Sequence, residues 1–539
     1  MLWRMAHEPR FDWDYNCLMT PSILLSLVLV VFPVLQKADH SEAGRWFEQA
    51  RRHFEKQQWD QSRSAALKAL QADPQFADAE ILVGMIARAQ TQLPEAEQHL
   101  KRAIALEPSN PQAHSYLAGV YLQQKRLTEA ERGYRQVLKL SPDNPVALYN
   151  LGLIALLRDR PALALENFES VRRNNPNDIP SLMGILETQL LLKRNIEAGR
   201  SAARLEAILD PSDPRLFQMA TLLAVHAEYS SAIQILERLS KQVPASFEVL
   251  YNLALAYVQT GQNDKAARAL RSLPALDQKA EGLNLLGQVE QKRNQPEEAL
   301  EAFSRAAALQ PQNEQFRFDH ANQLLQAGRG EKAAEAFRQG CLEFPQSWKM
   351  RTGLGACQYL SGQYQGAAQS LLEAVRIEPD SSITFFLLGR LYPLVVDLQE
   401  RIREAFSRYL DRPRTDAWAY FNFGSILFLH AQSQTQSDFE PAVRHLHRAL
   451  ELSPRFPEAS LQLAMVFQTQ GKLDESVRIL EQVVTSAPEL ASARYRLAQT
   501  YQRLGAKEKA EVQFGAYEKL KAQSKPEEEI HSLLQTVGR

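Results

Sequence analysis

The chain is poor in the residues that build disulfide-bonded, metal-binding or nucleic-acid-binding proteins. Its 539 residues include only 3 cysteines, and none of these has the C-x-x-C spacing of zinc and redox sites. The 62 Lys and Arg residues are balanced by 63 Asp and Glu residues, which leaves a net charge of -1. Because a chain without a basic excess lacks the electrostatic footprint for phosphate contacts, we expect no nucleic acid partner.

Sequence signatures of catalysis are absent as well. There is no G-x-x-x-x-G-K phosphate loop, no G-x-G-x-x-G fingerprint, no H-E-x-x-H motif and no G-x-S-x-G motif. Apolar residues make up 45% of the chain, so a folded core is expected, but a single core rarely grows to this length. We therefore predict an elongated or multidomain protein without enzymatic activity, cofactor or metal.

The N-terminal segment 1–42 differs from the rest of the chain. Its residues 23–35 form an uncharged apolar run of thirteen residues, shorter than the ~20 that a membrane span needs but typical of a secretory signal. No clean cleavage site follows, and the true start is Met1 or Met19. We predict export to a periplasmic or extracellular location. An uncleaved membrane anchor, which would be the only membrane contact, and a cytoplasmic chain remain alternatives.

The rest of the chain repeats with a period of about 34 residues. Prolines mark this period at positions 74, 108, 142, 176, 211, 244, 311, 345, 379, 413, 454 and 488. Small residues such as Ala164 and Gly152 recur twelve and twenty-four residues before these prolines. Small side chains at fixed positions allow two helices to pack closely. Apolar residues at i, i+3, i+4 and i+7 predict that each unit is an antiparallel helix pair.

This pattern resembles the tetratricopeptide repeat family, whose W-x2-L-G-x2-Y, A-x3-F and closing P positions recur here. The third unit shows them in Tyr116-Leu117-Ala118, Tyr121, Ala130, Tyr134 and Pro142. Fourteen units begin at residues 43, 77, 111, 145, 179, 213, 247, 280, 314, 348, 382, 417, 457 and 491. The resemblance implies an all-α, right-handed α-α superhelix of about fourteen helix-turn-helix units.

The pattern also predicts where the solenoid is irregular. Leu186 replaces a small residue in the fifth unit, and Arg401 and Ile402 surround the small position of the eleventh, which has Pro393 within its first helix. We expect looser packing in both. A polar insert at 432–438 lengthens the turn of the twelfth unit. The domain prediction is therefore regular repeats at 43–388, an irregular region and candidate hinge at 389–441, regular repeats at 442–524, and a capping helix at 525–539.

Cys341 and Cys357 are predicted to lie in neighbouring helices. Two buried free thiols and a disulfide both fit this placement, and free thiols are the commoner outcome. His445 and His447 are two residues apart on one helix and point to different faces, so we do not expect them to share a metal ion.

The resemblance implies that positions two, five, six, nine, twelve and thirteen of each first helix line an inner groove that binds extended peptides. Position five is aromatic in eight of the fourteen units and is never lysine. Position six carries asparagine only in three scattered units, at Asn150, Asn252 and Asn422. The candidate groove residues are Tyr149, Phe217, Tyr251, Phe318, Phe386, Trp418, Phe421 and Tyr495.

Two functions remain open. The first is a scaffold that binds other proteins or peptide segments in this groove. The alternative is an accessory subunit of an enzyme complex, such as one for envelope glycan synthesis or protein glycosylation, because related repeats are often fused to or docked on transferases. At the groove itself, the aromatic residues could instead serve only to pack neighbouring helices.

Overall fold

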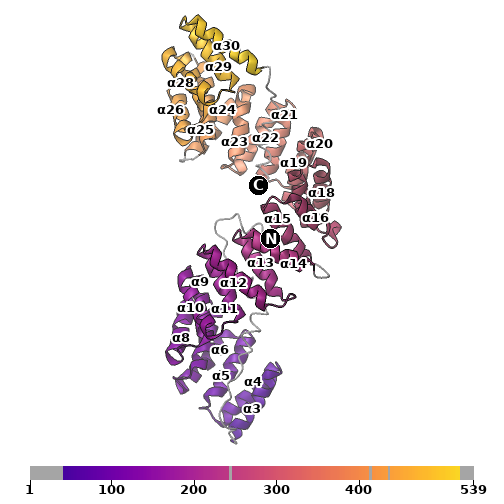
Figure 1. Ribbon diagram of the computed structural model, residues 1–539, viewed down its shortest axis with the longest axis vertical. Helices are drawn as coiled ribbons and strands as arrows, with labels where there is room; N and C mark the ends of the chain where they lie inside the picture. Colours follow the sequence, from indigo (N-terminus) through magenta and orange to yellow (C-terminus); the bar gives the residue numbers. More distant parts are fainter. Residues whose placement is uncertain (1–40, 242–245, 412–415, 435–437, 522–539) are drawn as a thin grey trace. The chain divides into compact units, whose positions relative to one another are not determined.

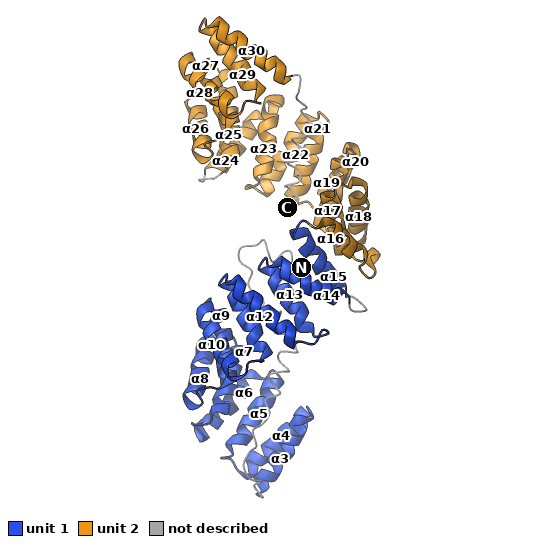
Figure 2. Ribbon diagram, in the orientation of Figure 1, with its two compact units in different colours: residues 1–261 blue, residues 262–539 orange. Residues whose placement is uncertain are grey.

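The computed structural model describes residues 41–241, 246–411, 416–434 and 438–521. The apolar segment 23–35 and the predicted capping helix 525–539 lie outside these residues. The chain divides into two compact units, residues 1–261 (unit 1) and 262–539 (unit 2), which Figure 2 shows in different colours. In the described residues both units consist of helices without strands, so the predicted all-α repeat fold is confirmed.

Unit 1 contains six complete helix pairs and one further helix (Figure 1). These helices are α3 (Glu42–Glu55), α4 (Trp59–Ala72), α5 (Ala77–Ala89), α6 (Leu93–Leu106), α7 (Pro111–Gln123), α8 (Leu127–Leu140), α9 (Pro145–Leu157), α10 (Pro161–Asn174), α11 (Ile179–Leu191), α12 (Asn195–Ile208), α13 (Pro214–Val225), α14 (Tyr229–Ser240) and α15 (Phe247–Gln259).

Unit 2 begins with the second helix of repeat 7 and continues to repeat 14. Its helices are α16 (Asn263–Arg271), α17 (Ala280–Lys292), α18 (Pro296–Leu309), α19 (Glu314–Gln326), α20 (Gly330–Glu343), α21 (Trp348–Leu360), α22 (Tyr364–Ile377), α23 (Ser382–Leu391), α24 (Gln399–Leu410), α25 (Ala417–Gln432), α26 (Glu440–Leu452), α27 (Pro457–Thr469), α28 (Leu473–Ser486), α29 (Ala491–Arg503) and α30 (Lys507–Lys521), with short 3-10 turns at Leu276–Gln278, Tyr392–Leu394 and Val396–Leu398.

Within each unit, most second helices pack between the first helix of their own repeat and that of the next. The first helices of successive repeats also contact one another, as α5 contacts α7 and α19 contacts α21. Contact between first helices places them on the more tightly curved side of the stack, which we call the inner face. Residues on the inner face are therefore supplied by the odd-numbered helices.

The recurring small residues hold the helices at close range, as predicted. The ring of Phe168, on α10, lies between Gly152 of its own repeat and Gly184 of the next. A Cβ atom at Gly152 or Gly184 would come within 2.6 or 2.8 Å of that ring. Where the second helix carries serine instead of alanine, its hydroxyl group donates to the facing backbone, as Ser62 does to the carbonyl of Ala50 at 2.7 Å.

Each regular repeat turns between its helices through one residue in the left-handed conformation. This residue occupies position fifteen of repeats 1 to 10, 13 and 14, and it has a φ between +53° and +79°. Glycine adopts this conformation without strain. The turn glycine of repeat 13, Gly471, has a φ of +75°. Gly471 and Lys472 therefore belong to the regular turn between the two helices of this repeat.

The expectation of looser packing in repeat 5 agrees with the helix contacts, because α11 and α12 contact each other less than the helix pairs of repeats 1 to 4 do, and α12 hardly contacts α13. Leu186 is fully buried, and the facing position of the second helix, where repeat 4 has Phe168, carries Ala202. The large and small side chains have exchanged helices, so the total volume at the contact is kept. Exchanges that conserve volume are well tolerated in cores.

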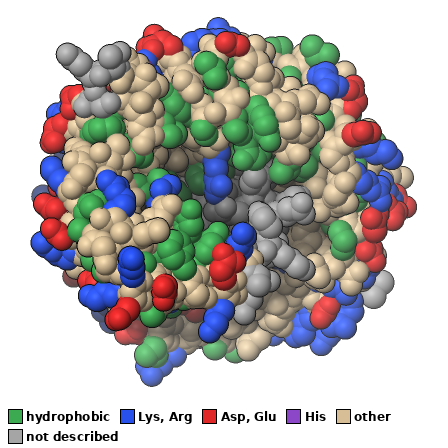
Figure 3. Space-filling model, turned by 90° about the horizontal axis from the view of Figure 1, so that it is seen from above, with side chains coloured by type: hydrophobic (Ala, Val, Ile, Leu, Met, Phe, Trp, Pro, Cys, Tyr) green, Lys and Arg blue, Asp and Glu red, His purple; other side chains and the backbone are tan. Residues whose placement is uncertain are grey.

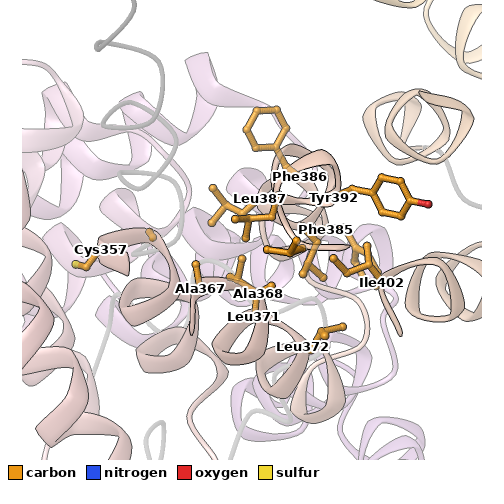
Figure 4. Packing of buried hydrophobic residues seen from close by; sticks show 14 of the residues in the cluster. Cys357, Ala367, Ala368, Leu371, Leu372, Phe385, Phe386, Leu387, Tyr392 and Ile402 are labelled. Atoms are coloured by element: carbon orange, nitrogen blue, oxygen red, sulfur yellow. The ribbon is translucent and has the colours of Figure 1, made fainter. Parts of the chain in front are cut away.

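The expectation of looser packing in repeat 11 agrees with the helix contacts, because α23 and α24 contact each other far less than the helices of the regular repeats do. Helix α23 ends at Leu391, so Pro393 lies in a 3-10 turn and not within a helix. The second helix, α24, buries Ile402 and Phe406 completely, one residue later than the repeat pattern predicts. This shift keeps Arg401 exposed. Repeat 11 belongs to the largest apolar cluster of unit 2 (Figure 4).

The longer turn of repeat 12 is confirmed by its helix ends, since α25 ends at Gln432 and α26 begins at Glu440. The division between the compact units falls at Gly261, in repeat 7, and not in the predicted hinge region 389–441. None of the described helices is both long enough and apolar enough to span a membrane.

Candidate functional site

An aromatic cluster lies on the inner face of repeats 11 and 12. Its members are Phe386 on α23, Trp418 and Phe421 on α25, and Phe456 immediately before α27. The ring centroid of Trp418 is 5.6 Å from that of Phe386, 5.6 Å from that of Phe421 and 4.6 Å from that of Phe456. The structure thus brings together three of the eight predicted groove residues, Phe386, Trp418 and Phe421. We call these three residues and Phe456 the aromatic cluster.

In the aromatic cluster, buried rings pack against one ring that is partly exposed to solvent. Phe386 and Phe456 are buried, Phe421 is half-buried, and Trp418 is 41% exposed. The guanidinium group of Arg390 lies 5.3 Å from the centroid of the Phe386 ring. Rings that are fixed by neighbours while one remains accessible can bury an apolar side chain at little entropic cost. In Figure 4, Phe386 lies at the edge of the apolar core.

Phe456 was not identified from the sequence. It precedes Pro457, the first residue of α27, and packs 5.2 Å from the ring of Phe421. An apolar residue just before a helix often packs against that helix or its neighbours. Phe76 precedes α5 in the same way and packs 4.9 Å from Phe47. A phenylalanine just before a first helix was therefore the sequence signal that could have identified Phe456.

Phe318 is removed from the set of groove candidates. Its side chain is fully buried and packs against Phe337 with ring centroids 5.7 Å apart, so no ring surface remains for a partner. Phe318 therefore serves helix packing.

The inner face of repeats 8 to 10 carries a buried polar network. The carboxylate of Asp319 accepts hydrogen bonds from the amides of Asn284 and Gln315, each at 2.8 Å. The ammonium group of Lys349 donates to Gln315 at 3.1 Å. Burial raises the pKa of Asp319 to about 6, although the two amide donors act in the opposite direction. The network was not predicted from the sequence because its members come from three repeats.

The scattered asparagines in unit 1 are engaged with their own helices. Asn150 donates to the carbonyl of Val146 and Asn252 donates to that of Glu248, each at 2.8 Å. Their side-chain amides therefore do not form a continuous row that could bind a peptide backbone.

The inner face of unit 1 carries several partly exposed apolar side chains. Tyr149, Phe217 and Tyr251 are half-buried. Burial raises the pKa of Tyr149 to about 12, so its hydroxyl group stays protonated near neutral pH. Position thirteen of repeats 4 to 6 forms a row of exposed apolar side chains, which we call the apolar row; its members are Leu157, Leu191 and Val225.

Tyr495 lies in the last described repeat and apart in sequence from the aromatic cluster. It is 36% exposed and packs against Phe514 and Tyr517 of α30, with ring centroids 5.9 and 5.1 Å away. Seen from the end formed by the last repeats, this face carries hydrophobic side chains interspersed with charged ones (Figure 3).

In the described residues, the side chains of Cys341, Cys357 and His445 contribute to packing. Cys341 and Cys357 are free thiols, and burial raises the pKa of Cys357 to about 12. His445 packs against the rings of Tyr420 and Phe423. No group of His, Cys, Asp and Glu residues is arranged to hold a metal ion within the part of the chain that the structure describes.

Stacked helix pairs with small residues at the contacts and side chains presented on an inner face define the class of α-helical repeat proteins. Models of the tetratricopeptide repeat match residues 47–111, 82–145, 129–179, 226–289, 280–313, 318–382 and 461–525. These segments together make up more than half of the sequence, and the chain belongs to the tetratricopeptide repeat family.

The chain is similar to two characterised proteins over part of its length. The BBSome complex member BBS4 homolog of Drosophila melanogaster is 24% identical over 174 residues, which are 32% of this chain and 36% of that protein. The human protein O-mannosyl-transferase TMTC1 is 26% identical over 181 residues, 33% of this chain and 20% of that protein. The matches therefore span about a third and a fifth of the relatives.

Among solved structures, the crystal structure of yeast Tom70 is similar with a TM-score of 0.36 and 16% identity. The alignment covers 82% of this chain and 96% of that one.

Proposed function

We propose that the protein is an interaction scaffold that binds extended protein segments on the inner faces of its repeats. Tetratricopeptide repeats generally serve protein interaction, and the chain has the helix pairs of that family throughout the described residues. The observation that carries the proposal is the aromatic cluster of unit 2, with Trp418 exposed above Phe386, Phe421 and Phe456.

The chemistry of the aromatic cluster favours an apolar side chain of a partner as its ligand. Burying such a side chain against ring faces removes apolar area from water, worth roughly 25 cal/mol per Å². Trp residues at the centre of interfaces commonly dominate the binding free energy. The predicted partner segment therefore carries a large apolar residue that packs against the accessible surfaces of Trp418 and Phe421.

The test begins with selection of linear peptides from a random display library against the full chain. Affinities of the recovered peptides are then measured for the wild type, Trp418→Ala and Leu342→Ala. Leu342 is a matched control because it is an exposed apolar residue on the second helix α20.

We expect Trp418→Ala to weaken binding by about 2 kcal/mol or more and Leu342→Ala to leave it unchanged. Urea unfolding of both variants verifies that the repeats remain folded. Equal affinities for all three proteins, or a library that yields no binder, would contradict the proposal.

A second candidate function is an accessory role in protein glycosylation. The similarity to a part of the human O-mannosyl-transferase TMTC1 favours it. In this case the chain should alter the rate of a purified glycosyltransferase from the same organism, and Trp418→Ala should remove that effect if the inner face makes the contact. An unchanged transferase rate would leave the scaffold function as the better proposal.

A further inference from the structure

Arg88 occupies an unusual place on the inner face of unit 1. It stands at position twelve of repeat 2, near the end of α5, where it meets the first helix of repeat 3, α7. Its Nε atom donates to Oε1 of Gln123 at 3.1 Å. Its guanidinium group lies directly against Gly119, where a Cβ atom would come within 2.8 Å of Nη1. The absence of a side chain at Gly119 therefore makes room for the arginine.

Arg88 is not neutralised by a carboxylate. The groups that favour its charged form are the phenols of Tyr134 and Tyr116, and no Asp or Glu of the described residues is among them. Burial lowers its pKa. Other arginines at contacts between repeats behave differently: Arg126 pairs with Glu97 at 2.8 Å, and Arg158 pairs with Glu131 at 2.5 Å.

A deeply placed guanidinium group without an anion is costly, because its desolvation is not repaid by an ion pair. Its planar fork of donors matches a carboxylate, which can accept two parallel hydrogen bonds. The phenol groups of Tyr116 and Tyr134 in repeat 3 interact electrostatically with the guanidinium group, and the apolar row of Leu157, Leu191 and Val225 follows in repeats 4 to 6 of the same unit.

We propose that Arg88 binds a carboxylate of a partner segment, with Gly119, Tyr116 and Gln123 shaping the site, and that apolar residues of the same segment lie on repeats 4 to 6. The partner is thus an extended peptide that combines an acidic residue with neighbouring apolar residues. The inference rests on the proposed function, since it assumes that the inner face binds peptides, and it specifies their chemistry in unit 1.

The experiment selects peptides from a displayed random linear library against three forms of the full chain: the wild type, Arg88→Gln and Arg132→Gln. Arg132 is the control because it is exposed on the second helix α8 and its replacement removes the same charge. We expect wild type and Arg132→Gln to enrich peptides with Asp or Glu beside apolar residues. Arg88→Gln should lose this enrichment and bind the wild-type peptides on the order of tenfold more weakly.

Two further variants separate binding from folding. Gly119→Ala keeps the charge but displaces the guanidinium group, so it should weaken acidic peptides as Arg88→Gln does. Arg88→Met removes an unpaired charge, so its urea midpoint should equal or exceed that of the wild type. A lower midpoint would show that Arg88 supports the fold and would overturn the proposal.

The outcome for this inference is distinct from that for the proposed function. Peptides that depend on Trp418 but bind Arg88→Gln as well as wild type would overturn the carboxylate site and leave the scaffold function standing. A library that yields no binder would overturn both.

Discussion

The inner faces of the two units use the same backbone for different surfaces. In repeats 4 to 6 of unit 1, position thirteen exposes Leu157, Leu191 and Val225. In repeats 8 to 10 of unit 2, inner positions two and five contribute to a buried network around Asp319. The helix pairs are alike, so the difference lies in which side chains the inner positions carry. One repeat architecture can therefore present apolar and polar inner surfaces without a change of fold.

The turns differ between the units as well. In unit 1 the left-handed turn residue of repeats 1 to 6 is never glycine; the residues are Gln57, Thr91, Lys125, Asp159, Lys193 and Ala227. In unit 2 it is Asn294 or a glycine, as at Gly328, Gly362, Gly471 and Gly505. Because a Cβ atom is strained in this conformation, the turns of repeats 1 to 6 carry strain that the glycine turns of unit 2 do not.

The largest expected effect concerns the polar inner face of unit 2. The pKa of Asp319 is raised from 3.8 to about 6 in the folded chain, so its contribution to stability is present below pH 4 and is lost as the pH rises through 6. The total loss is roughly 3 kcal/mol. Asp319→Asn should remove this pH dependence, measured by urea unfolding between pH 4 and 8. A constant difference between wild type and variant over that range would contradict the buried network.

The second prediction tests whether the units unfold separately. Ala299 is fully buried where α17 and α18 meet, so Ala299→Leu should overpack the contact and destabilise unit 2 by about 1–3 kcal/mol. Hydrogen exchange should show faster opening in repeats 7 to 9 and no change in repeats 1 to 5. Ser304→Leu, at an exposed position of α18, is the control. Equal loss of protection in both units would show that they unfold as one.

The third prediction concerns the apolar row of unit 1. Leu191 is 48% exposed, so Leu191→Ser should change the unfolding free energy by less than about 1 kcal/mol. The same change should weaken peptides that bind unit 1 by about 1 kcal/mol, because it removes apolar contact area. Leu342→Ser should leave this affinity unchanged. An equally unaffected affinity for Leu191→Ser would mean that the apolar row is not a binding surface.

The smallest effects come from exchanging the turn residues. Ala227, with a φ of +63°, should gain about 1 kcal/mol of stability on replacement by glycine, whereas Gly362, with a φ of +75°, should lose about as much on replacement by alanine. Gly199→Ala is the control, since Gly199 lies within α12 in open space and should favour alanine by about 0.5–1 kcal/mol. Thermal unfolding measures all three, and the same sign for Ala227→Gly and Gly362→Ala would refute the turn comparison.

The repeat period was sufficient to predict the helices, their pairing and most close contacts. It does not record pairs of residues that compensate each other in volume, as Leu186 and Ala202 do, because the pattern treats each position separately. It also failed where the register shifts by one residue, as before Ile402.

At the candidate site, position five predicted the aromatic residues but not their exposure. Phe318 and Phe421 occupy equivalent positions, yet the first is fully buried and the second is half-buried, because neighbouring repeats cover them differently. The Asp319 network and the Arg88 site depend on contacts between repeats, which the position pattern does not record.

The most direct test of the account is photo-crosslinking with a peptide selected on the full chain and carrying a diazirine in place of its largest apolar side chain. We predict crosslinks to first helices, at Trp418 or Phe421 on α25 or along the apolar row, and their loss when unlabelled peptide competes. Crosslinks confined to second helices such as α20 or α26 would contradict the claim that the inner faces bind the partner.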